Sequence, residues 1–237
     1  MKTVIKQVLF GKKKLWTPAN IPTELWFSFA DNSSIILTAN KISQWNDKSG
    51  NNRHAMETVD ANRPLASNGG VTFDGVDDKL TTSSTFSLPT NRNSFFLVEK
   101  NLGGGTGSAP YSFSASTNGS GIVYQSNVGL QPFSSVVYSQ PSGRMLLVTQ
   151  GNNIGYINGV LSAITFGDGL YSNSLFSVGR RIVGDLYTSG TIYEVVVFSG
   201  ELSTEIIDKL FGYAAFLYGL QSQLPANHPY KRRPPYR

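Results

Sequence analysis

The sequence predicts an all-β protein in which two antiparallel sheets pack face to face as a jelly-roll sandwich. Short segments rich in β-branched and aromatic residues recur along the chain, each bounded by Gly, Asn, Ser or Pro. No helical segments alternate with them, which argues against strand–helix–strand units. The 24 Gly residues and the abundant Ser, Thr and Asn indicate many tight turns. At 237 residues, one such domain with appendages is expected.

The strands are expected in order along the chain, at 25–30 (LWFSFA), 71–75 (VTFDG), 94–100 (SFFLVEK), 121–126 (GIVYQS), 134–139 (SSVVYS), 144–150 (RMLLVTQ), 153–159 (NIGYING), 175–181 (LFSVGRR) and 191–199 (TIYEVVVFS). One helix follows them. Ser203 is a good N-cap, Glu205 lies in the first turn, and Gly219 is a natural C-terminal stop. Apolar residues recur between them at three- and four-residue steps, so this helix is expected to cover one end of the sandwich.

The two ends of the chain carry most of its positive charge. The net charge is +5, but nine of the 20 Lys and Arg lie in residues 1–22 or 220–237, which contain no acid. The part between the ends therefore has a net charge of −4. We divide the chain into a basic apolar N-terminal arm and linker (1–22), a sandwich (23–201), a capping helix (202–219) and a basic, Pro- and Tyr-rich tail (220–237).

The ends also contain large apolar side chains, which purely solvating tails seldom carry. For the lysine run alone, solvation and docking are equally good interpretations. The aromatic residues among these apolar side chains favour docking to a partner. The residues predicted to dock are Lys2, Lys6, Phe10, Lys12, Lys13, Lys14, Trp16, Tyr230, Arg232 and Arg233.

Motifs for catalysis and cofactor binding are absent from the sequence. Without Cys there is no disulfide, thiolate metal site or cysteine nucleophile, and no G-x-S-x-G elbow or P-loop occurs. No run of paired acids suggests a two-carboxylate glycosidase, so the sequence predicts a protein that is not an enzyme and needs no cofactor. No segment is long and apolar enough to span a bilayer, and the body lacks the basic stripe of a nucleic-acid binder.

Two polar loops contain the remaining candidate residues. Asp74, Asp77 and Asp78 surround Gly75, and such oxygen-rich loops can hold calcium; a β-turn that needs a glycine at position 75 is the better interpretation. The other loop, QWNDKSGNNRHA (44–55), begins with Trp45. We expect this ring in the core and the polar residues after it in a tight turn, rather than around a sugar.

Several segments together resemble the laminin-G-like members of the concanavalin A-type lectin and glucanase superfamily. They are SQWNDKSGNNRHA, the Arg63–Pro64 pair, GGVTFDGVDDKL, GYINGVL, LFSVGRR and TIYEVVVFSGELST, which extend over roughly 23–220. The last segment, GYAAFLYGLQSQLPANHPYKRRPPY, resembles the ending of such domains in bacteriophage virion proteins. The resemblance implies a jelly roll that binds sugars or docks to proteins. The acidic signature of the glucanases is missing.

From these features we expect a virion structural protein, a capsid decoration, collar or tail-associated component assembled in the host cytoplasm. Its basic ends would bind many copies of capsid or tail subunits. The alternative is a carbohydrate-binding, receptor-recognition module, for which Tyr111, Tyr138 and Tyr171 are the candidate sugar-stacking residues. A glycoside hydrolase is a third hypothesis, and for it we expect no turnover.

Overall fold

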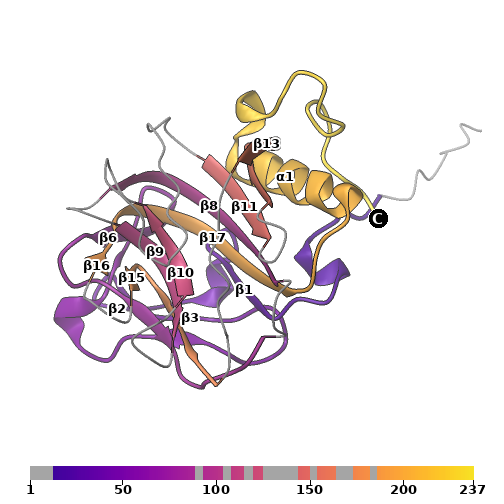
Figure 1. Ribbon diagram of the computed structural model, residues 1–237. Coiled ribbons are helices and arrows are strands. Elements are labelled where there is room, and N and C mark those ends of the chain that lie inside the picture. Colours follow the sequence, from indigo (N-terminus) through magenta and orange to yellow (C-terminus); the bar gives the residue numbers. More distant parts are fainter. Residues whose placement is uncertain are drawn as a thin grey trace, which may run out of the picture.

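The computed structural model describes residues 13–88, 93–103, 108–114, 120–124, 144–149, 154–163, 173–181 and 186–237 (Figure 1). The first strands are β1 (Leu25–Ser28), β2 (Ile35–Thr38), β3 (Lys41–Trp45), β4 (Ala55–Met56), β5 (Leu65–Ser67), β6 (Gly70–Asp74) and β7 (Leu80–Thr82). They are followed by β8 (Asn93–Gly103), β9 (Ser108–Ser114), β10 (Ser120–Tyr124), β11 (Arg144–Thr149), β12 (Ile154–Ile157) and β13 (Val160–Ala163). The last are β14 (Leu175–Val178), β15 (Arg180–Arg181), β16 (Leu186–Tyr187) and β17 (Ser189–Ser199), and then the helix α1 (Thr204–Tyr218). Short 3-10 turns lie at Pro18–Asn20, Asn32–Ser34, Asp60–Asn62 and Gln221–Gln223.

Hydrogen bonds join most of these strands into one antiparallel sheet. Among the described residues it has 15 strands, in the order β10-β9-β14-β7-β4-β3-β5-β6-β17-β8-β11-β12-β13, with β1 attached to β17 and β2 to β3. The strands β15 and β16 form a separate pair. The prediction of a mostly β protein with one C-terminal helix is therefore confirmed. The finer prediction, two sheets in a jelly roll, stays a prediction.

The long strands β8 and β17 divide the apolar interior into two cores. Because side chains alternate along a strand, Phe95 and Leu97 of β8 point into a first core, with Phe27 and Trp45. Phe96 of β8 and its neighbours point into a second core on the opposite face of β8, which α1 covers. Figure 1 shows α1 lying across the sheet beside β8 and β11. The second core is the one that positions the candidate site.

The helix begins and ends where its sequence predicts. Ser203 accepts a hydrogen bond from the Ile206 N–H at its N-terminus, and Gly219 adopts a left-handed conformation (φ 70°) after its last residue. Phe211 is fully buried and meets Phe96 edge to face, with ring centroids 5.4 Å apart. None of the helices in the described residues has the length and apolarity needed to cross a membrane.

Some predicted strands differ from those in the structure. The strand expected at 153–159 ends at Ile157, where Asn158 and Gly159, both with positive φ (52° and 82°), turn the chain into β13. This Asn-Gly pair is the usual signal for a tight two-residue hairpin turn. The segment 175–181 divides at Gly179 into β14 and β15. The strand predicted at 134–139 lies outside the described residues.

The two ends of the described chain pair with each other. Leu15 and Tyr236 form an antiparallel bridge. The Trp16 N–H donates to the Pro235 carbonyl (3.0 Å), and the Arg237 N–H donates to the Lys14 carbonyl (2.9 Å). In Figure 1 the C-terminus accordingly lies beside the indigo N-terminal segment, close to α1. We call residues 13–17 and 234–237 the paired ends.

The tail between α1 and the paired ends packs against a glycine of the helix. A Cβ at Gly212 would lie 2.4 Å from Cβ of Tyr230, so the two segments touch through backbone and ring. We expect Gly212→Ala to lower the free energy of unfolding by about 1–3 kcal/mol, although Ala is the better helix former by about 1 kcal/mol. Thermal unfolding measures the loss. Adding Tyr230→Gly, which removes the Cβ as well as the ring, should relieve this contact and restore part of the loss. An unchanged melting temperature in Gly212→Ala would contradict the contact.

Candidate functional site

A pocket of about 450 Å³ lies between α1, the paired ends and the strand β1. Its apolar walls are formed by Leu15, Trp16, Trp26, Tyr213, Phe216, Leu217, Pro234 and Pro235. Polar side chains lie on the side of β1 and the loops around it, namely Ser28, Asp31 and Lys48, with Thr17 at the paired ends. This volume is typical of small-molecule sites, and so is the combination of aromatic walls with a few polar groups.

Three aromatic rings of the walls are held by packing within the chain. Trp16, Trp26 and Tyr213 are 4%, 5% and 9% exposed and belong to the second core. The rings of Trp16 and Tyr213 meet edge to face, with centroids 6.3 Å apart. Since these rings are already packed in the core, an occupant would not have to order them on binding.

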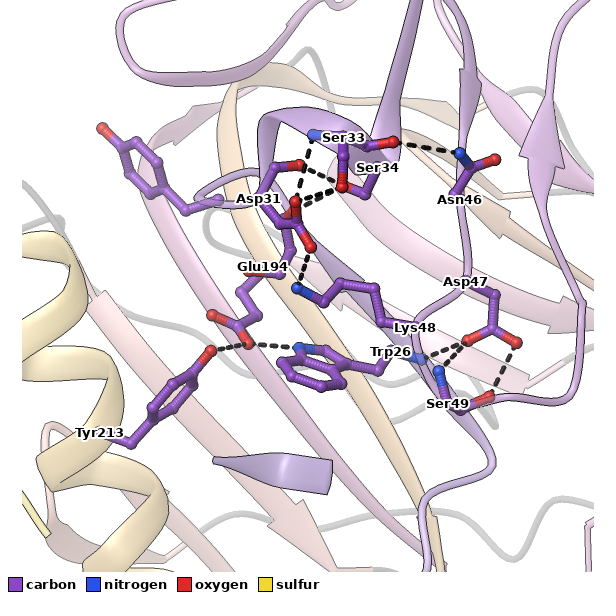
Figure 2. Close-up of polar contacts among 12 residues, drawn as sticks. Trp26, Asp31, Ser33, Ser34, Asn46, Asp47, Lys48, Ser49, Glu194 and Tyr213 are labelled. Atoms are coloured by element: carbon purple, nitrogen blue, oxygen red, sulfur yellow. Dashed lines mark hydrogen bonds and ion pairs between the residues drawn. The ribbon is translucent and has the colours of Figure 1, made fainter. Parts of the chain in front are cut away.

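A buried carboxylate behind the pocket links two of these rings. Glu194 of β17 is fully buried, and its Oε1 accepts hydrogen bonds from Trp26 Nε1 (2.6 Å) and the Tyr213 hydroxyl (2.9 Å). Figure 2 shows Glu194 between the two rings. Its Oε2 has no hydrogen-bond partner among the described residues. The alternation of β17 explains this placement, because Val196 and Phe198 face the same second core.

Burial shifts the pKa values of these groups. It raises the pKa of Glu194 to about 7, while the nearby hydrogen-bonding groups of Tyr218, Trp26 and Tyr213 act in the opposite direction. Burial is also the largest cause that raises the pKa of Tyr213, followed by the charge of Glu194. The Tyr213 phenol therefore stays protonated and donates its hydrogen to the carboxylate.

An ion pair lies at the polar side of the pocket. Lys48 Nζ is 2.5 Å from Asp31 Oδ2 and 4.6 Å from the centroid of the Trp26 ring (Figure 2). Asp31 Oδ1 accepts from the backbone N–H and the hydroxyl of Ser33, at 3.1 and 2.6 Å. The hydrogen bond from Lys48 is the largest of several causes that lower the pKa of Asp31, and those from Ser33 act in the same direction. Asp31 is therefore ionised at neutral pH.

The loop after Trp45 positions Lys48. Asp47 is buried, and its carboxylate accepts from the backbone N–H groups of Trp26 (3.0 Å), Ser49 (2.9 Å) and Arg53 (3.1 Å). Trp45 itself is fully buried and stacks on Phe27, with centroids 5.4 Å apart. The expectation of a core ring followed by turn chemistry is confirmed. No sequence pattern distinguishes Lys48 from the other polar residues of that loop.

The acidic loop at 74–78 also has the expected turn. Gly75 has φ 83°, and Asp74 Oδ1 accepts from the Val76 N–H at 2.8 Å. Asp78 is buried and accepts from the Asp74 N–H (2.9 Å), and its burial and the charge of Asp74 raise its pKa to about 6. One carboxylate oxygen from each of Asp74, Asp77 and Asp78 lies within 4.8 Å of the others. These oxygens suit a hard cation in type, and calcium binding stays a prediction.

The side chains of many residues predicted for docking or sugar stacking are not described by the structure. Lys2, Lys6, Phe10, Lys12, Tyr138 and Tyr171 lie outside the described residues, and for Tyr111 only the position on β9 is described. Lys13, Lys14, Arg232 and Arg233 are exposed. The ring of Tyr230 packs on Gly212, and that of Trp16 belongs to the second core and lines the pocket. Packing within the chain therefore accounts for both rings.

Four residues of the site were not predicted from the sequence, namely Asp31, Lys48, Glu194 and Tyr213. One signal was available, because Glu194 is a single acid within the apolar strand TIYEVVVFS. A charge in such a strand must be paired or hydrogen-bonded once it is buried. Its partners could not be found, since Trp26 lies 168 residues away in the sequence.

Comparison with known proteins relates the fold to sugar-processing enzymes. No protein-family model matches the sequence, and no curated protein is significantly similar to it. Among solved structures, the chain is similar to the sialidase of Trypanosoma rangeli in complex with sialic acid (TM-score 0.52, 17% identity, 85% of this chain and 35% of that one). It is also similar to domain 4 of an extracellular arabinanase from Geobacillus stearothermophilus in complex with arabinotriose (TM-score 0.51, 17% identity, 79% and 98%).

These comparisons show the fold alone, because the identities are low. The chain spans about a third of the length of the sialidase, but its likeness extends over nearly the whole arabinanase domain. They correct the expectation that the protein is unrelated to enzymes, stated above as a protein that is not an enzyme. The fold occurs within glycosidases and is enzyme-related.

Proposed function

We propose that this protein is a carbohydrate-binding domain and that the sugar binds in the pocket between α1, β1 and the paired ends. The observation that carries the proposal is the combination of Trp16, Trp26 and Tyr213 with the polar pair Asp31 and Lys48 around one pocket. Sugar rings present an apolar face of C–H groups and an edge of hydroxyls, which such walls complement. The likeness to a domain solved with arabinotriose supports the proposal at the level of fold. We also propose that the strands of this domain form the two packed sheets of a jelly roll.

The test uses a substitution that blocks the pocket without disturbing the cores. Leu217 lines the pocket and is 42% exposed, so Leu217→Arg places a long charged side chain at its mouth. The matched control is Leu161→Arg on β13, where the leucine is 64% exposed and does not line the pocket. Calorimetric titration with a panel of neutral oligosaccharides that includes arabinotriose, and with sialic acid, measures binding.

We expect the unmodified chain and Leu161→Arg to bind at least one sugar equally, and Leu217→Arg to lose at least tenfold in affinity. Absence of binding by the unmodified chain across the panel would refute the proposal. Equal binding by both variants would place the sugar elsewhere.

Attachment to a virion through the basic ends is a second proposal. One observation favours it, since the pairing of the ends brings Lys13, Lys14 and Arg237, all exposed, to neighbouring positions. Clustered cations suit a repeated acidic surface, on which many copies multiply weak contacts. Because the backbone of Lys14 and Arg237 takes part in the pairing of the ends, the informative variant replaces the three side chains of Lys13, Lys14 and Arg237 with those of Gln. Particles that retain this variant at the normal level would refute this role.

A further inference from the structure

Asp31 and Lys48 present an acceptor and a donor side by side at the pocket. Lys48 carries three N–H donors, of which one faces Asp31, and the ammonium lies near the Trp26 ring. Asp31 Oδ1 accepts two hydrogen bonds from Ser33, whereas among the described residues Oδ2 accepts from Lys48 alone. A carboxylate has about four acceptor positions. One donor and one acceptor therefore remain next to each other.

We propose that the Asp31–Lys48 pair binds two adjacent hydroxyl groups of a neutral sugar, an inference that rests on the proposed function. One hydroxyl donates to Asp31 Oδ2, and its neighbour accepts from Lys48 Nζ. Hydrogen bonds with a charged partner are roughly twice as strong as neutral ones, so both contacts favour a vicinal diol over a single hydroxyl.

The pair is held in place before any ligand arrives. Ser33 fixes the Asp31 carboxylate from the 3-10 turn Asn32–Ser34, and the Asp47 loop fixes the backbone next to Lys48 (Figure 2). Asp31 and Lys48 are partly exposed, with side-chain exposures of 37% and 23%, so a ligand can reach them. A preformed donor–acceptor pair costs little ordering on binding, which increases affinity.

The charges of the pocket select against acidic sugars. Lys48 is neutralised by Asp31, and the carboxylate of Glu194 lies behind Trp26. An acidic sugar would meet Asp31 directly, with no second cation among the lining residues to balance it. The pocket therefore fits a neutral sugar with adjacent hydroxyls on one edge and an apolar face toward the rings.

Calorimetric titration of Asp31→Asn, Lys48→Met and the double variant tests this assignment. The probe is the neutral oligosaccharide that the unmodified chain binds most tightly, with sialic acid as the acidic comparison. Lys48→Met keeps the apolar stem on Trp26 and removes the ammonium. The control is Glu205→Gln, which removes the exposed ion pair with Lys209 (2.6 Å) on α1, away from the pocket. Melting temperatures verify that each variant is folded.

We expect each single variant to lose about 10- to 100-fold in affinity, and the double variant to lose less than the product of the two. The control should bind normally. If Leu217→Arg abolishes binding but both Asp31→Asn and Lys48→Met bind within twofold of the unmodified chain, the pair is not the contact and the carbohydrate-binding proposal stands. Tighter binding of sialic acid than of every neutral sugar would also overturn the inference. If the unmodified chain binds no neutral sugar, the inference fails; if it binds no sugar at all, the proposed function fails as well.

Discussion

Glu194→Gln is expected to make the protein progressively more stable than the unmodified chain as the pH rises from about 4.5 to above 7. The pKa of Glu194 is raised from its usual 4.5 to about 7, because the carboxyl is fully buried. A raised folded-state pKa means that the stabilising proton is present at low pH and is lost as the pH rises through the folded value. The glutamine variant has no proton to lose there. It still offers Oε1 to Trp26 and Tyr213.

The difference in the free energy of unfolding between the two proteins should reach about 1–3 kcal/mol at pH 8. Urea unfolding at pH 4.5, 6 and 8 measures it. Glu205→Gln is the matched control, because Glu205 is exposed and its pKa is lowered by Lys209 rather than raised. Glu194→Ala should instead destabilise at every pH, since it leaves two buried donors unpaired. A Glu194→Gln curve parallel to that of the unmodified chain would show that Glu194 ionises as in water.

Phe211→Ala is expected to lower the free energy of unfolding by about 3–5 kcal/mol and to weaken sugar binding as well. Phe211 is fully buried between Phe96 and Tyr156, with ring centroids 5.4 and 6.4 Å away. It attaches α1 to the sheet, and α1 supplies Tyr213, Phe216 and Leu217 to the pocket. Loosening the helix therefore removes one wall.

Phe216→Ala separates packing from binding on the same helix. Phe216 lines the pocket and is only partly buried, so its loss should weaken sugar binding while costing clearly less stability than Phe211→Ala. Chemical denaturation and calorimetry on both variants check the two effects. Equal destabilisation by the two substitutions would contradict this division of roles.

Local features of the fold follow from the sequence because short-range chemistry decides them. Ser203 and Gly219 mark the ends of α1, and Trp45 lies in the core before a turn held by Asp47. The split of 153–159 was missed, although Asn158-Gly159 is a strong turn signal. In each case the information lies within a few residues.

The candidate site depends on pairings between distant segments, which a single sequence does not reveal. β17 pairs with β8 along one edge and with β6 and β1 along the other, and this register places Glu194 opposite Ser28. Only then does Glu194 reach Trp26 on the face covered by α1. The ends illustrate the same limit. In the structure Leu15 and Tyr236 pair with each other and Trp16 packs inside the chain, contacts that a single sequence does not reveal, and docking of the ends to another protein stays a prediction.

The most direct measurement of the central claim is the response of the three tryptophan indole N–H signals in an NMR titration with the bound oligosaccharide. Trp16 and Trp26 line the pocket, while Trp45 is fully buried in the first core. We predict that saturating sugar shifts the signals of Trp16 and Trp26 and leaves that of Trp45 unchanged. A sugar that binds with no shift at Trp16 or Trp26 would contradict the account.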